Sequence, residues 1–70
     1  MPEAQGRHPA IEHVLKYFSY QHLPPHLQEI SKGFHDLAMV TADRAPNSQE
    51  TTVALRKLLE AKDAAVRSVL

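Results

Sequence analysis

The longest uninterrupted helical pattern of the sequence covers its last third, residues 47–70, which read NSQETTVALRKLLEAKDAAVRSVL. This stretch contains no Gly or Pro, and its apolar residues recur three and four positions apart, the period of an amphipathic helix. Those apolar residues are Leu55, Leu58, Leu59, Ala65, Val66 and Val69. Asn47 is a suitable N-cap, and Glu50 stands three residues later, as in a capping box. The pattern predicts a helix from Ser48 to Ser68, about 30 Å long, which must pack against other elements.

The length and composition of the chain limit how it can be stabilised. Seventy residues make a single domain, 1–70, and so small a chain buries little apolar surface by itself. The sequence has no cysteine, so neither a disulfide nor a thiolate zinc site can supplement the core. Oligomerisation is the remaining common source of support, and we expect it here.

Charge and hydropathy exclude several classes of partner. Eight Lys and Arg residues balance eight Asp and Glu residues, which argues against DNA or RNA as a partner. No apolar run approaches the length of a membrane span, and the first ten residues, MPEAQGRHPA, lack a signal-peptide core. We therefore expect a soluble, intracellular protein with no membrane partner.

The beginning of the chain predicts a flexible end followed by one short helix. Residues 1–9 are polar and contain Pro2, Gly6 and Pro9, so we expect them to be flexible. Residues 10–18 follow the helical period and form a helix too short to be stable alone, which must dock on the longer helices. The apolar face of this short helix consists of Ile11, Val14, Leu15 and Phe18.

The Pro24-Pro25 pair separates the first helix from a second one. A proline disfavours helix at the preceding residue and suits the first turn of a new helix. We predict this second helix over residues 25–43. Its inner face is predicted to be Leu27, Ile30, Phe34, Leu37, Ala38 and Thr41. Gly33 weakens the helix by about 1 kcal/mol relative to Ala, and it indicates either close approach of a backbone or ligand, or an ordinary surface position.

The connector at residues 44–47 is short enough to fold the third helix back onto the second. The predicted fold is therefore all-α: a short N-terminal helix plus a long antiparallel helical hairpin. Alanines and leucines leave the third helix apolar on more than one side, and one hairpin can cover only one stripe. The surplus residues are Leu59, Ala61, Val66 and Val69. This surplus predicts that the hairpins assemble into a compact homo-oligomer.

Residue types give little support for catalysis or metal binding. His22 and His26 are four apart, but the double proline lies between them, and no carboxylate completes a helical zinc motif. No nucleophile elbow or Gly-rich phosphate loop is present. Glu29 and Asp36 lie seven residues apart, a spacing more typical of solvated carboxylates than of an acid–base pair. We predict no catalytic residue, no metal ligand and no cofactor.

Aromatic and polar residues gather around the double proline. They are Tyr17, Phe18, Tyr20, His22 and His26, with Lys32 and His35 on the helix that follows. An aromatic ring offers a stacking surface for a base, and lysine offers a point charge to a phosphate. By residue type alone the simpler interpretation is favoured, in which Tyr17 and Phe18 belong to the core and Tyr20 is a partly buried loop residue.

The combination of FSYQHLPPHLQEISKGFHDLA with ETTVALRKLLEAKDAAVR resembles the phage-encoded helical-hairpin family of anti-CBASS and anti-Thoeris nucleotide sponges. The resemblance covers residues 17–69. It consists of a Phe-x-Tyr before a His- and Pro-containing loop, a Leu-Ala near the end of the first long helix, and a second helix rich in Leu and Ala. In this chain, Glu29 and Ser31 occupy a region that is more basic in better-known members.

The resemblance implies a function and a set of site residues. Such proteins are compact hexamers that sequester cyclic oligonucleotide signals of bacterial immune systems without hydrolysing them, in the cytoplasm of the infected host. The ligands it implies are cyclic dinucleotides, cyclic trinucleotides or cyclic ADP-ribose isomers. Tyr20 would stack on a base, Lys32 or His35 would meet the phosphate, and His22 completes the predicted ligand-binding set. The alternative is a structural or regulatory helical-hairpin oligomer that binds only protein.

Overall fold

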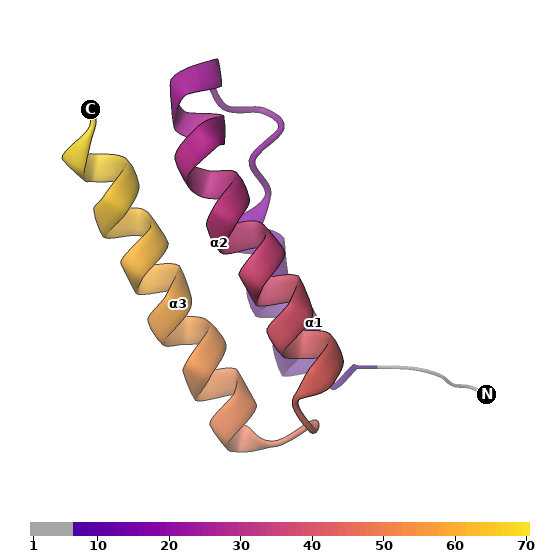
Figure 1. Cartoon of the computed structure of the whole chain (residues 1–70). Helices are drawn as coiled ribbons and strands as arrows, with labels where there is room; N and C mark the ends of the chain where they lie inside the picture. The colour runs from indigo at the N-terminus through magenta and orange to yellow at the C-terminus, as the bar shows by residue number, and fades with distance from the viewer. Residues whose placement is uncertain (1–6) are drawn as a thin grey trace.

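The computed structural model describes residues 7–70, and in this part of the chain every regular element is a helix. The elements are α1 (Pro9–Leu15), the 3₁₀ helix η2 (Lys16–Phe18), α2 (Pro25–Arg44) and α3 (Gln49–Ser68). The predicted all-α class is therefore confirmed. The helices α2 and α3 lie side by side and are joined at one end by residues 45–48, and α1 packs against both of them (Figure 1).

The first helix begins one residue earlier than predicted and ends in a tighter turn. His8 caps α1, because its Nδ1 accepts a hydrogen bond from the backbone N–H of Ala10 at 3.0 Å, and Pro9 opens the first turn. The last part of the predicted helix, Lys16–Phe18, is wound as 3₁₀ helix. Residues 1–9 were predicted to be flexible, and residues 1–6 of this segment lie outside the described part of the chain.

The second helix matches its predicted range to within one residue. Pro25 occupies its first turn, and Pro24 precedes it in an extended conformation. The helix ends at Arg44, and Ala45 is extended, as expected for a residue that precedes a proline.

The third helix is capped by Ser48, so the prediction that Asn47 and Glu50 form a capping box is wrong by one residue. Ser48 Oγ accepts a hydrogen bond from the backbone N–H of Thr51 at 3.2 Å. The Thr51 hydroxyl in turn donates to the carbonyl of Pro46 at 2.6 Å. Thr51 is buried, and this bond fixes the connector against the start of the helix.

One cluster of buried side chains joins all three α-helices. It contains Ile11, Val14, Phe18, Ala38, Ala42 and Leu55. Partly buried apolar residues pack against it: Leu15, Phe34, Leu58 and Leu59. The predicted apolar face of the first helix is thus confirmed. Phe18 is a core residue, as the simpler interpretation of the aromatic cluster requires.

The inner face of α2 is shifted from the prediction. Leu37 was expected inside, yet its side chain is 53% exposed. The buried positions are Leu27, Ser31, Ala38 and Ala42, which are four or seven residues apart and therefore lie along one stripe. An ideal Cβ built on Gly33 meets no atom within 4 Å, so in the protomer this glycine is an ordinary surface position.

Burial along α3 is uneven. Thr51 and Leu55 are buried, whereas every residue from 56 to 70 is partly or fully exposed. The molecule measures 41 × 21 × 16 Å, with a radius of gyration of 12.7 Å. A compact chain of this length is expected near 11 Å, about 2.2 times the 0.38 power of the residue number. The protomer is therefore elongated, and its core is small.

Candidate functional site

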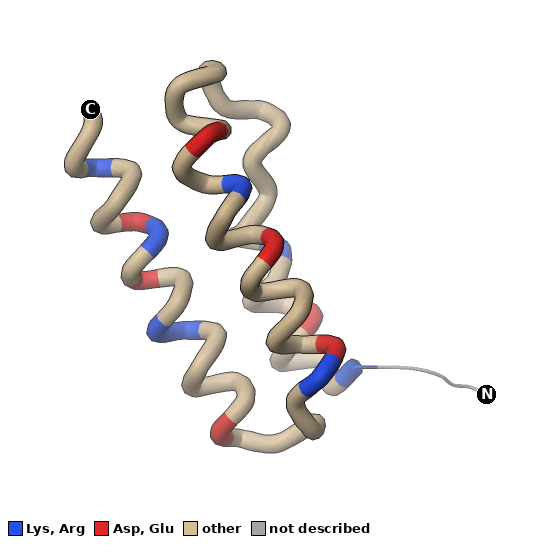
Figure 2. The backbone as a smooth tube through the Cα atoms, in the orientation of Figure 1, with Lys and Arg blue, Asp and Glu red and all other residues tan. Residues whose placement is uncertain are grey.

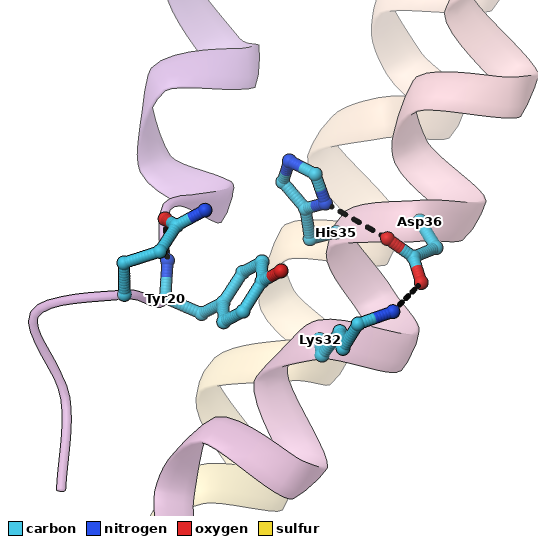
Figure 3. A network of polar contacts seen from close by, with 5 residues as sticks. Tyr20, Lys32, His35 and Asp36 are labelled. Atoms are coloured by element: carbon cyan, nitrogen blue, oxygen red, sulfur yellow. Dashed lines mark hydrogen bonds and ion pairs between the residues drawn. The ribbon is translucent and has the colours of Figure 1, made fainter. Parts of the chain in front are cut away.

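Three of the four residues predicted to bind a ligand lie together. Tyr20, in the loop after η2, reaches toward α2 and meets the ring of His35 edge-on, with ring centroids 5.1 Å apart and an interplanar angle of 65° (Figure 3). Lys32 lies one turn before His35 on the same helix, and Asp36 follows. We call these four residues, Tyr20, Lys32, His35 and Asp36, the Tyr20 corner.

The loop that carries Tyr20 is held against α2 by its own hydrogen bonds. The Gln28 side-chain amide donates to the carbonyl of Leu23 at 2.7 Å and to that of Gln21 at 3.3 Å. The Leu23 N–H donates to the carbonyl of Tyr20 at 3.0 Å, which closes a turn. Because the double proline also restricts the backbone here, the aromatic ring is presented from a defined loop conformation.

Asp36 bridges Lys32 and His35, the two residues of the Tyr20 corner that are predicted to meet a phosphate. Its carboxylate accepts from Lys32 Nζ at 2.7 Å and contacts His35 Nδ1 at 3.0 Å (Figure 3). The hydrogen bond from Lys32, and to a lesser extent the one from His35, lower the pKa of Asp36. The hydrogen bond to Asp36 in turn raises the pKa of Lys32. An incoming phosphate must therefore compete with Asp36 for the lysine. The pattern Lys-x-x-x-Asp on a helix could have revealed this pair from the sequence.

His22 does not join the Tyr20 corner. It lines a separate hollow of about 350 Å³ between residues 16–23 and the last turns of α3. Tyr17, which the simpler interpretation placed in the core, lines the same hollow and is 54% exposed. That placement was wrong because η2 turns Phe18 inward, and its neighbour Tyr17 consequently faces outward.

The remaining polar groups do not assemble into a metal site. Among the residues that the structure describes, no three His, Cys, Asp or Glu side chains are close enough to hold a metal ion. Glu29 is exposed, and Asp36 is engaged with Lys32 and His35. In residues 7–70, none of the helices combines the length and the apolar character needed to span a bilayer.

Comparison of the chain with known protein families, curated proteins and solved structures gave no match. The geometry of the described residues therefore carries the functional argument.

Proposed function

We propose that this protein is a phage anti-defence sponge, which binds cyclic oligonucleotide immune signals without cleaving them. The observation that supports this most directly is the Tyr20 corner. It brings together an aromatic ring that can stack on a base with a lysine and an imidazole that can contact a phosphate. The ligand class comprises cyclic dinucleotides, cyclic trinucleotides and cyclic ADP-ribose isomers, and the site of action is the cytoplasm of the infected bacterium.

The proposal includes assembly of helical hairpins into a homo-oligomer, a hexamer by resemblance. The Tyr20 corner lies on the surface of one narrow protomer, which cannot enclose a ligand of dinucleotide size. The site would be completed where two protomers meet, so we expect fewer than one ligand per chain. Exposed apolar side chains on both long helices, and on the two residues that follow α3, are available for such contacts. They are Leu37, Val40, Val53, Val69 and Leu70.

The second candidate function is an oligomeric helical hairpin that binds only protein. The same exposed apolar residues favour it, since they need a partner but not a nucleotide. Both candidates predict oligomers, so the oligomeric state does not distinguish them, whereas nucleotide binding does.

The test is a thermal-shift screen of the intact protein against a panel of cyclic nucleotides, followed by calorimetry of any hit. A ligand that binds only the folded state raises the melting temperature. Loss of one stacking contact costs about 1–3 kcal/mol per base, so Tyr20→Ala should weaken binding by one to two powers of ten. Lys32→Ala should also weaken it, and wild-type affinity should fall with added salt.

The control is Arg44→Ala, which also removes an exposed cation but at the far end of α2. It should leave affinity unchanged, and each variant must keep the wild-type oligomeric state. If folded Tyr20→Ala and Lys32→Ala proteins bind as tightly as wild type, the site assignment is wrong. Denaturing the complex should release intact ligand, and a linear product above a no-protein control would favour a phosphodiesterase instead.

A further inference from the structure

The hollow lined by His22 has an excess of positive charge in a chain whose formal net charge is zero. Lys16 reaches it from η2, and Lys62 and Arg67 reach it from α3. Asp63 is the one carboxylate among the residues that line it. The hollow therefore has three cations for one carboxylate. The Tyr20 corner differs in this respect, because its single lysine, Lys32, is paired with Asp36.

Lys62 is the least exposed of the lysines that form ion pairs in the described residues. Its side chain is 13% exposed, compared with 58% for Lys32 and 73% for Lys57. Its ammonium forms an ion pair with the Asp63 carboxylate at 3.2 Å, and an ammonium has three N–H donors to satisfy. Covering an ammonium costs solvation free energy that a single half-exposed carboxylate recovers only in part. A second anion in the hollow would supply the missing acceptor.

An aromatic surface lies beside these cations. Tyr17 lines the hollow, and the ring of His13 meets it edge-on with centroids 5.6 Å apart, at an interplanar angle of 79°. In a T-shaped pair the histidine covers at most one face of the tyrosine ring, so this contact leaves at least one face for stacking. The volume of about 350 Å³ falls in the range of small-molecule sites, about 300–1,000 Å³.

We propose that this hollow is a second anion site, which takes the phosphate of a nucleotide on Lys62 and Arg67 and the base on Tyr17. It is separate from the Tyr20 corner because the loop turns Tyr20 toward α2 and turns His22 and Leu23 toward α3. The proposal uses neither Tyr20 nor Lys32, so it stands independently of the proposed function.

The experiment is calorimetric titration of the intact protein with ADP and, separately, with inorganic pyrophosphate. Arg67→Gln is the main variant, because Arg67 is exposed and its loss should not affect folding. A hydrogen bond to a charged group contributes about 1.5–3 kcal/mol, so the variant should bind ADP roughly tenfold more weakly. Lys62→Gln should do the same, and Tyr17→Ala should weaken ADP binding but not pyrophosphate binding.

The control separates this site from a general charge effect. Arg44→Gln removes one exposed cation elsewhere and should bind ADP like wild type. Equal ADP affinity for wild type and folded Arg67→Gln would overturn the proposal. If pyrophosphate binds as tightly as ADP and Tyr17→Ala has no effect, the assignment of a nucleotide is overturned.

Discussion

The two ends of the helical bundle have different composition and packing. At the end where α2 joins α3, Ala42 and Leu55 are buried with Ile11, and Thr51 is bonded to the connector. At the other end, α3 continues for more than three turns without a buried residue. We call these the closed end and the open end.

The ion pairs differ between the two ends, although acidic and basic residues are interspersed along both long helices (Figure 2). At the closed end Arg7 pairs with Glu12 at 3.0 Å and also with Asp43, so it ties the start of α1 to the end of α2. At the open end Lys62 and Arg67 share a hollow with a single carboxylate. The closed end thus combines core packing with an ion pair between helices, whereas the hollow at the open end gathers three cations around one carboxylate.

The largest expected effect is on the closed end. Leu55→Ala deletes a fully buried side chain from the core cluster and should lower the free energy of unfolding by about 2–5 kcal/mol. The same substitution at the open end, Leu70→Ala, should change it by less than about 0.5 kcal/mol. Urea denaturation of both variants measures the difference, and equal losses would contradict the division into two ends.

The next prediction concerns the exposed face of α3. Ala61 is exposed in the protomer, so Ala61→Glu should leave a single chain able to fold. In a close helix contact between subunits it would bury an unpaired charge and weaken assembly by at least about tenfold. Light scattering at micromolar concentration measures this, with Ala61→Ser as the control of similar size. A wild-type protein that is a folded monomer would refute the proposed oligomer.

A smaller effect, of opposite sign, is expected at Ser31. Its hydroxyl is buried and has no hydrogen-bond partner among the described residues. Ser31→Ala removes this unsatisfied group and should raise the free energy of unfolding by about 1 kcal/mol, at the low end of the desolvation cost. Ser68→Ala is the matched control, since that exposed hydroxyl donates to the carbonyl of Ala65 at 2.6 Å and should not stabilise when removed. If Ser31→Ala destabilises the protein, the hydroxyl has a partner that stabilises it.

The smallest effect is the pH dependence of the Lys32–Asp36 pair. Because the pKa of Asp36 is lowered in the folded chain, its contribution is present above the ordinary carboxyl pKa and is lost as pH falls through the lowered value. The pKa of Lys32 is raised, so its contribution is present below the ordinary lysine pKa and is lost as pH rises through the raised value. Below about pH 4, the free energy of unfolding should therefore fall less steeply with decreasing pH in Asp36→Asn than in wild type. Denaturation at a series of pH values measures this. The same pH dependence in both proteins would show that the pair contributes nothing to stability.

Sequence reasoning located the helices well and the details of their faces less well. Prolines and apolar spacing placed the boundaries of α2 and α3 and the start of α1 within one residue of the observed ones, because these signals act locally; α1 itself ends three residues earlier than predicted, where η2 begins. The inner face of α2 was misjudged in part. Leu27 and Ala38 are buried as predicted, but Leu37 was placed inside for its hydrophobicity, and Ser31 and Ala42 were left out. Only packing against α1 and α3 decides that Ser31 and Ala42 lie inside.

The Tyr20 corner was predictable in part for the same reason. Lys32 and His35 share a helix, so their proximity follows from spacing, and the double proline keeps Tyr20 near that helix. Asp36 was interpreted as a solvated carboxylate, although its spacing from Lys32 indicates an ion pair. The hollow around His22 could not be predicted, because it joins residues 16–23 to residues 62–67 of α3, which are distant in the sequence.

The uneven burial of α3 also has a consequence for motion over time. Helical segments that bury few apolar side chains open locally without waiting for the whole molecule to unfold. The turns after Leu59 can therefore fray and re-form while Leu55 stays anchored, so their amide hydrogens exchange with solvent sooner than those around Thr51 and Leu55. A partner or ligand that binds the open end should suppress this local opening. Binding would therefore be detected as slower amide hydrogen exchange in residues 60–68.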